Sequence, residues 1–218
     1  MRLRLYVMDI RELEEAALCA AALRLLDSER KEKALKAGNA KDRARRVGAG
    51  LLLLLGHERM DERASNGNDS LQILSPAIII QTIEDEEKKR GCPLSEGIQY
   101  EISDRGRPAW KQAPDYYPYF NLSHSGNYAA LVTGDVEVGI DVQEPRKVLH
   151  RSIGNYQSFC KLESYFKCTG RGIDKRIDDC YAELEEAESS GEYLFRSINM
   201  PDEYALWVCA RNGKPERS

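Results

Sequence analysis

The sequence lacks the long apolar stretch that a membrane span or a secretory signal peptide requires. Its longest uninterrupted apolar run is Leu51 to Leu55, whereas a transmembrane helix needs about 20 such residues. The alternating start MRLRL at 1–5 is typical of a strand and not of a leader peptide. We therefore expect a cytoplasmic protein that has no membrane partner.

Cysteine and histidine are scarce, with six and three residues, and no two cysteines form a CxxC pair. A zinc knuckle is therefore disfavoured. Scattered cysteines without an export signal are typical of reduced thiols that are buried as small apolar side chains. Excess positive charge is also missing, because 32 basic and 36 acidic residues give a net charge of -4. This balance disfavours nucleic acid as a partner.

The 218 residues, 42% of them hydrophobic, suffice for a sizeable core. Periodicity and composition predict helices at 12–26, 29–37, 41–56, the end of 71–90, 155–169 and 174–190. Strands are predicted at 2–8, 98–103, 118–121, 128–133, 136–142, 192–198 and 204–210. Asp27 and Ser28 can end one helix and cap the next, and 61–70 is a polar loop. This succession predicts an α+β fold in two parts, 1–135 and 136–218.

A basic segment lies near the start of the first part. Between positions 24 and 46, nine basic residues accompany four acidic ones, and such a local excess suits phosphate groups. The alternative is an ordinary solvated helix face.

Two short motifs adjoin the predicted strands. In FNLSHSG at 120–126, a histidine between two hydroxyls can donate to a phosphate, although a structural histidine is the alternative. In VGIDVQ at 138–143, Asp141 is costly to bury unpaired. A hard cation such as Mg2+ would compensate it, with Gln143 on the same strand face as a neutral oxygen donor. The alternative is an aspartate that caps the strand or pairs with a basic side chain.

The segment FCKLESYFKCTGRG at 159–172 is predicted to be a helix that ends at glycine. Glu163 and Lys167 are four residues apart and share one face. By itself such a pair is an ordinary surface ion pair.

Together these segments resemble the 4′-phosphopantetheinyl transferases of the double-length, surfactin-synthetase-activating type. The resemblance runs from ERKEK at 29–33 through GRP at 106–108, FNLSHSG and GID at 139–141 to the ESxxK helix. It implies two similar α+β halves related by a pseudo-two-fold axis, with coenzyme A in the cleft between them and the second half shortened here. It also implies transfer of phosphopantetheine from coenzyme A to a serine of an acyl or peptidyl carrier protein, with release of adenosine 3′,5′-bisphosphate. The resemblance implies Mg2+ as the cofactor, and a monomer is expected.

The resemblance also assigns a coenzyme A-binding set in three segments. The basic positions near its phosphates are matched by Arg30, Lys33 and Arg45. The turn beside its adenine is matched by Gly106, Arg107 and Pro108, and the positions near its 3′-phosphate by Ser123 and His124.

A second set is assigned to the metal and the chemistry. Asp141 matches the first Mg2+ ligand, and Glu163 matches both the second ligand and the general base. Gln143 stands at the third metal position, where many relatives have a carboxylate, and Lys167 matches the lysine that contacts the transferring phosphate.

Further departures concern the helix and its connection to Asp141. Leu162 replaces a lysine of the usual motif, and Phe159 replaces a tryptophan. The connection from Asp141 to Glu163 is about half as long as in relatives, although reach is no obstacle at about 3.3 Å per residue. Active transferase is thus the leading hypothesis, and a non-catalytic module that binds coenzyme A or a carrier protein is the alternative.

Overall fold

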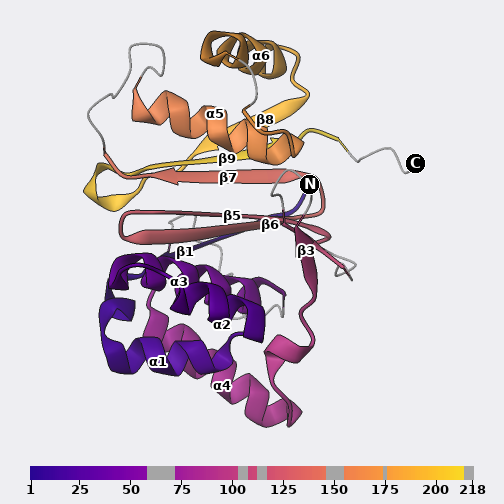
Figure 1. Ribbon diagram of the computed structural model, residues 1–218. Coiled ribbons are helices and arrows are strands. Elements are labelled where there is room, and N and C mark those ends of the chain that lie inside the picture. The colour runs from indigo at the N-terminus through magenta and orange to yellow at the C-terminus, as the bar shows by residue number, and fades with distance from the viewer. Residues whose placement is uncertain (58–71, 103–107, 112–116, 146–154, 174–175, 214–218) are drawn as a thin grey trace. The chain divides into compact units, whose positions relative to one another are not determined.

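A computed structural model describes residues 1–57, 72–102, 108–111, 117–145, 155–173 and 176–213. The chain divides into two compact units (Figure 1). The strand-rich unit comprises Met1–Leu5, Tyr100–Gly126 and Val132–Ser218. The helical unit comprises Tyr6–Gln99 and Asn127–Leu131.

The described part of the helical unit contains four α-helices, and in two of them a residue typical of helix N-termini explains where the helix begins. Their bounds are α1 (Ala16–Leu25), α2 (Ser28–Leu35), α3 (Ala40–His57) and α4 (Pro76–Arg90). Asp27 caps α2 by accepting a hydrogen bond from the Arg30 backbone N–H at 2.9 Å, and Pro76 starts α4, where its missing N–H costs nothing. Residues 47–56 of α3 are buried and form much of this unit's core. None of the described helices has the length and apolarity needed to cross a membrane.

The described strands form three sheets. The largest has the order β2-β1-β6-β5, made of β2 (Ile73–Leu74), β1 (Leu3–Asp9), β6 (Tyr128–Gly134) and β5 (Tyr119–Ser125). A small antiparallel pair joins β3 (Tyr100–Ile102) to β4 (Pro108–Trp110). The third sheet is antiparallel, with the order β7-β9-β8.

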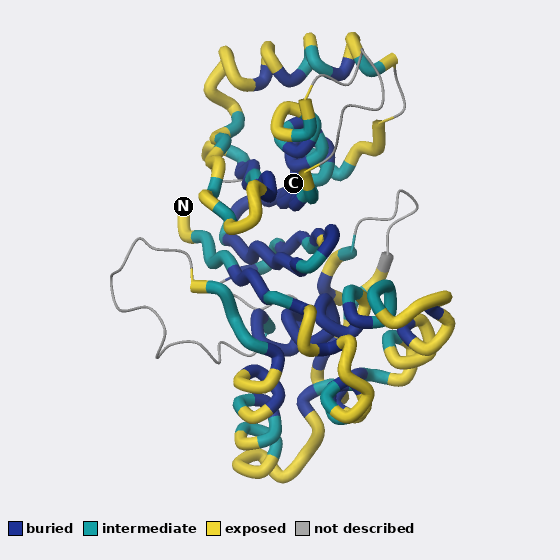
Figure 2. The backbone as a smooth tube through the Cα atoms, turned by 90° about the vertical axis from the view of Figure 1, so that its left-hand side faces the viewer, coloured by how far each residue is buried: buried dark blue, intermediate teal, exposed yellow. Residues whose placement is uncertain are grey.

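The β7-β9-β8 sheet carries the helices of the strand-rich unit. Its strands are β7 (Val138–Gln143), β8 (Tyr193–Ser197) and β9 (Ala205–Arg211). Helix α5 (Tyr156–Thr169) lies along this sheet, and α6 (Ile177–Ser189) lies outside α5 (Figure 1). Strands β7 and β9 are mostly buried, whereas β8 consists of half-buried and exposed residues. Helix α6, at the top of Figure 2, alternates between buried and exposed positions. The core of this unit therefore lies between α5 and the strands β7 and β9, and α6 packs with one face only.

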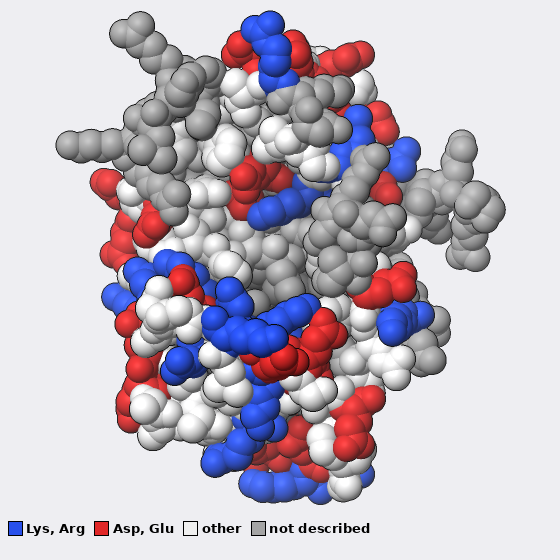
Figure 3. Space-filling view, in the orientation of Figure 1, with Lys and Arg blue, Asp and Glu red and all other residues white. Residues whose placement is uncertain are grey.

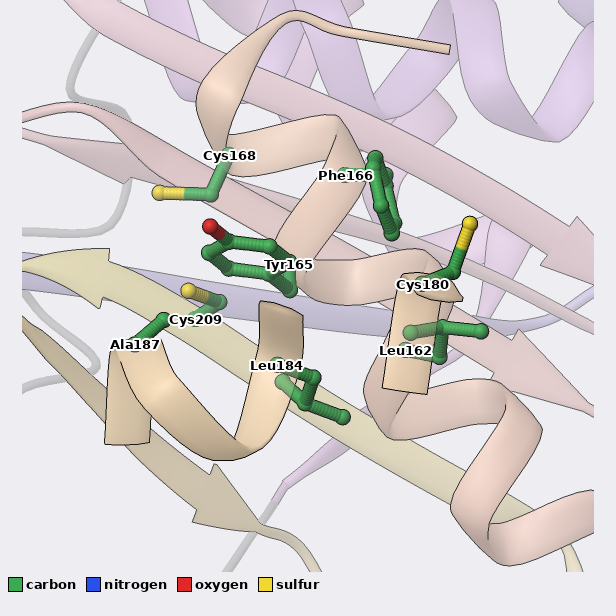
Figure 4. Packing of buried hydrophobic residues seen from close by; sticks show 8 residues of the cluster. All are labelled: Leu162, Tyr165, Phe166, Cys168, Cys180, Leu184, Ala187 and Cys209. Atoms are coloured by element: carbon green, nitrogen blue, oxygen red, sulfur yellow. The ribbon is translucent and has the colours of Figure 1, made fainter. Parts of the chain in front are cut away.

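An apolar cluster joins α5, α6 and the sheet (Figure 4). Its buried members are Leu162, Tyr165, Phe166, Cys168, Cys180, Leu184, Ala187 and Cys209.

Helix α5 begins after Asn155, whose side chain accepts from the Ser158 N–H, and ends at Gly170 with φ 70°. This end confirms the glycine stop expected from TGRG.

The α+β class is confirmed, and most of the predicted elements are present. The predicted helix at 12–26 is wrong at its start, because a 3-10 turn (Arg11–Glu14) comes first and Glu15 is extended before α1. Strands β2 and β4 were not predicted, and the predicted loop at 61–70 lies outside the described residues. All six cysteines are free and five are buried, but Cys92 is exposed, against the expectation. The division at residue 135 and the pseudo-two-fold symmetry stay predictions.

Candidate active site

The site depends on an unusually close contact between α5 and β7. Cys160, Ser164 and Cys168 recur every four residues on α5, and each is 0% exposed. A Cβ atom on Gly139 of β7 would lie 2.1 Å from the Ser164 carbonyl oxygen and 2.3 Å from the Cys168 nitrogen. Small side chains on both elements thus let the helix backbone rest on the strand.

This contact places Lys167 against Asp141, which is 1% exposed. The Lys167 Nζ lies 2.5 Å from Asp141 Oδ1. The Ser123 hydroxyl of β5 donates to the same Oδ1 at 2.8 Å and accepts from Lys167 Nζ at 3.1 Å. A buried carboxylate needs such partners. Of the alternatives considered for Asp141, pairing with a basic side chain is therefore the one that the structure shows, and the partner is Lys167.

Glu163 lies beside this pair, one helical turn before Lys167. Its Oε2 is 3.9 Å from Lys167 Nζ, and its side chain is 28% exposed. Burial and the nearby Asp141 carboxylate raise the pKa of Glu163 to about 7, against an opposing effect of Lys167. Two carboxyl groups that interact in this way tend to share a proton unless a cation takes its place.

The residues around Asp141 have the donor chemistry of a Mg2+ site in part. Mg2+ is commonly held by one or two carboxylates, with waters and substrate phosphates completing its shell, and Asp141 and Glu163 supply two. Gln143 Nε2 donates to Asp141 Oδ2 at 2.9 Å, so its amide faces the carboxylate with its hydrogen atoms. No group of three Asp, Glu, His or Cys side chains suited to a metal ion occurs among the described residues. The fit therefore rests on the two carboxylates.

A ladder of polar side chains holds β5 against β7. Asn121, Ser123 and Ser125 alternate along β5 and point to the same side. Their oxygens accept from every second N–H group along β7 and just after it, namely Ile140 at 3.2 Å, Val142 at 3.2 Å and Glu144 at 3.1 Å. The constant offset of 19 residues shows a regular register. This ladder was not predicted, although FNLSHSG contains the pattern N-x-S-x-S.

An open pocket of about 370 Å³ adjoins the ion pair. Its walls come from β4, β5, α5 and the residues after α5, and they include Pro108, Asn121, Glu163, Lys167 and Arg171. The end of α5 therefore presents one carboxylate and two basic side chains to the same space.

Arg171 is fixed at this pocket by two partners. Its guanidinium pairs with Glu183 of α6 and donates to the Tyr165 hydroxyl at 3.3 Å. The Tyr165 hydroxyl in turn donates to Glu183 at 3.1 Å. Arg171 was not predicted as a site residue, because its position depends on Glu183 of α6.

The motif departures on α5 have a packing explanation. Leu162 is 0% exposed in the apolar cluster, and Phe159 packs against it. Lys161 pairs with Glu188 at 2.7 Å and lies over the rings of Phe195 and Trp207. Leu162 therefore belongs to the core.

The predicted phosphate-binding basic residues lie in the helical unit, where blue side chains gather over the helices (Figure 3). Each has an acidic neighbour on its own helix or cap: Arg30 with Asp27, Lys33 with Glu29, and Arg45 with Asp42. His124 is exposed on β5. Gly106 and Arg107 lie outside the described residues, whereas Pro108 lines the pocket. The structure thus brings together Ser123, Asp141, Gln143, Glu163 and Lys167.

The chain is similar to two curated 4′-phosphopantetheinyl transferases. One, psf-1 of Bacillus pumilus, is 26% identical over 146 residues, which cover 53% of this chain and 62% of the relative. The other, from Bacillus subtilis, is 22% identical over 144 residues, 52% of this chain and 63% of the relative. The matched part thus spans under two thirds of either relative. No protein-family model matches. The two relatives support the 4′-phosphopantetheinyl transferase superfamily.

Proposed function

We propose that this protein transfers the 4′-phosphopantetheine group of coenzyme A to a serine of an apo acyl or peptidyl carrier protein and releases adenosine 3′,5′-bisphosphate. The observation that carries the proposal is the contact of the buried Asp141 with the half-buried Glu163 and Lys167. The two similar transferases and the order of the sequence motifs agree with it. The double-length type with two related halves is part of the proposal.

The reaction needs a proton acceptor and compensation of phosphate charge. Glu163 takes the proton of the carrier serine as a general base. Its pKa is near 7 in the metal-free site, and a bound cation would lower it and so favour the carboxylate that accepts the proton. Lys167 contacts the transferring phosphoryl group with its ammonium. Asp141 and Glu163 would hold Mg2+, which, when bound, supplies positive charge to the pyrophosphate. The open pocket beside these residues admits the substrate.

Phosphate recognition is assigned to Arg30, Lys33 and Arg45, and the adenine-side turn to Gly106, Arg107 and Pro108. Carrier proteins of this class are acidic, so the basic segment also suits their docking.

His124→Ala is expected to weaken coenzyme A binding by about 10- to 150-fold, because a charge-assisted hydrogen bond contributes about 1.5–3 kcal/mol. Binding of 3′-dephospho-coenzyme A should change much less, since it lacks the group that His124 is proposed to contact. Isothermal titration calorimetry with both ligands measures the difference. Equal losses for the two ligands would remove His124 from the 3′-phosphate.

The transferase itself is tested by intact-mass spectrometry of apo carrier proteins incubated with this protein, coenzyme A and Mg2+. We expect a mass gain of one phosphopantetheine group, which EDTA suppresses and excess Mg2+ restores. Carrier proteins of fatty-acid, polyketide and peptide synthesis should be tried in parallel. The absence of any gain, with coenzyme A binding measured separately, would contradict the proposal.

The second candidate is a non-catalytic module that binds coenzyme A or a carrier protein. Gln143 favours it, because its amide donates to Asp141 where many relatives have a third carboxylate. The mass measurement separates the two candidates, since this module would bind coenzyme A without modifying any carrier protein.

A further inference from the structure

We infer that Ser123 is a positioning residue of the proposed site. Its hydroxyl holds the Lys167 ammonium on Oδ1 of Asp141. Oδ2 of Asp141 and the Glu163 carboxylate then stay available to a divalent cation. This inference rests on the proposed function for its catalytic consequence. It goes beyond the resemblance, which places Ser123 near the 3′-phosphate of coenzyme A.

The hydrogen-bonding capacity of the Ser123 hydroxyl is completely used. A hydroxyl has one donor and two acceptor positions. Here the O–H group donates to Asp141 Oδ1 at 2.8 Å. The oxygen accepts from Lys167 Nζ at 3.1 Å and from the Val142 N–H at 3.2 Å. A phosphate oxygen could accept from Ser123 only if the bond to Asp141 were broken.

The position of Ser123 makes these bonds costly to break. The residue is 7% exposed, and its partners belong to β7 and α5, whereas the hydroxyl itself comes from β5. It is thus the point at which three elements meet. Groups in this position orient the ligands of a metal without touching it, and their loss typically lowers metal affinity 10- to 100-fold.

The two oxygens of Asp141 have different partners and therefore different roles. Oδ1 receives both Ser123 and Lys167, whereas Oδ2 accepts from the weaker neutral donor Gln143 at 2.9 Å. The Glu163 carboxyl also hydrogen-bonds to Asp141, so the two carboxyl groups that would share a cation already lie together. A cation approaching from the Oδ2 side has to displace one amide hydrogen bond and not the ammonium. Without the Ser123 hydroxyl, Lys167 would lose an acceptor and could move across the carboxylate into that space.

Ser125 offers a matched control two residues along the same strand. It is 8% exposed, and its hydroxyl accepts from the Glu144 N–H at 3.1 Å, so it repeats the ladder bond of Ser123. Among the described residues, it makes no hydrogen bond to Asp141 or Lys167. A variant at Ser125 therefore removes the ladder bond alone.

The experiment compares Ser123→Ala, Ser123→Thr and Ser125→Ala in the full chain. Mn2+ binding, followed by electron paramagnetic resonance, should weaken about 10- to 100-fold in Ser123→Ala. It should stay close to wild type in Ser125→Ala and be largely retained in Ser123→Thr, which keeps a hydroxyl. Thermal melts with EDTA identify any variant that has lost its fold.

A second readout separates positioning from phosphate binding. If Ser123 acts through Asp141 and Lys167, Ser123→Ala should lower kcat equally with coenzyme A and with 3′-dephospho-coenzyme A. Unchanged Mn2+ affinity, or a loss confined to coenzyme A, would overturn the inference. If wild type binds Mn2+ and shows the Ser123 effect but modifies no carrier protein, the proposed transferase fails while the positioning role stands.

Discussion

Replacing Glu163 by glutamine is expected to lower phosphopantetheine transfer by about 10²- to 10⁴-fold, the usual contribution of a positioned general base. The amide keeps the shape of the side chain but cannot take the serine proton, and it contributes no charge to a cation. Coenzyme A should still bind, because the residues assigned to it lie elsewhere. Single-turnover kinetics measure the loss of transfer, and isothermal titration calorimetry measures whether coenzyme A affinity is retained. Unchanged turnover would remove Glu163 from the mechanism.

The same variant should also be more stable than wild type at pH 8. The pKa of Glu163 is raised from 4.5 to about 7 in the folded state. The unfolded chain therefore loses the proton first, and the free energy of unfolding falls as the pH rises from about 4.5 to 7. Since one pKa unit corresponds to about 1.4 kcal/mol, the cost above pH 7 is up to about 3 kcal/mol.

Melting temperatures at pH 5 and pH 8, with EDTA present, measure this cost. Glu163→Gln should raise the melting temperature by several degrees at pH 8 and by much less at pH 5. Glu185→Gln is the matched control, because Glu185 is exposed on α6 and its replacement should change neither value. A stabilisation of equal size at both pH values would show that the ionisation of Glu163 is not its cause.

The resemblance predicts that Asp141, Glu163 and Lys167 share one site, and the structure has these three side chains close together. Asp141 and Glu163 are far enough apart in the chain that only a fold can join them, and the structure joins both to Lys167. The short connection between them does not prevent this. Their catalytic and metal-binding roles remain predictions.

The sequence was less informative about β5. Its polar pattern predicts a phosphate-binding motif, whereas Asn121, Ser123 and Ser125 all accept hydrogen bonds from N–H groups of β7 or of the residue after it. Which partner such side chains choose depends on which strand lies beside them, and no local pattern carries that information. Ser123 belongs to this group because its lysine partner is 44 residues away.

Short elements escaped prediction for a different reason. Strands β2 and β4 have two and three residues, too few to show alternation. The proline at the start of β4 also argues against a strand interior. Likewise, the Cys160, Ser164 and Cys168 stripe became recognisable as a contact face only once β7 was known to lie beneath it.

Gly139→Ala is expected to destabilise the protein by about 3 kcal/mol or more, the upper range for overpacking a core. The new methyl would meet backbone atoms of α5, at 2.1 Å from the Ser164 oxygen and 2.3 Å from the Cys168 nitrogen. Backbone atoms in a helix cannot rotate away as side chains do, so α5 as a whole would have to move. Urea unfolding followed by circular dichroism measures the loss.

Gly38→Ala provides the control, because a Cβ there meets nothing within 4 Å. It should change the free energy of unfolding by no more than about 0.5 kcal/mol, as is usual for surface positions. If Gly139→Ala matched this control, the close contact between α5 and β7 would be refuted. If it unfolds as expected, the glycine of the GID motif has a mechanical role, because it sets the distance at which Glu163 and Lys167 can reach Asp141. Gly139, two residues before Asp141, would then be required to assemble the site, independently of any role in the reaction.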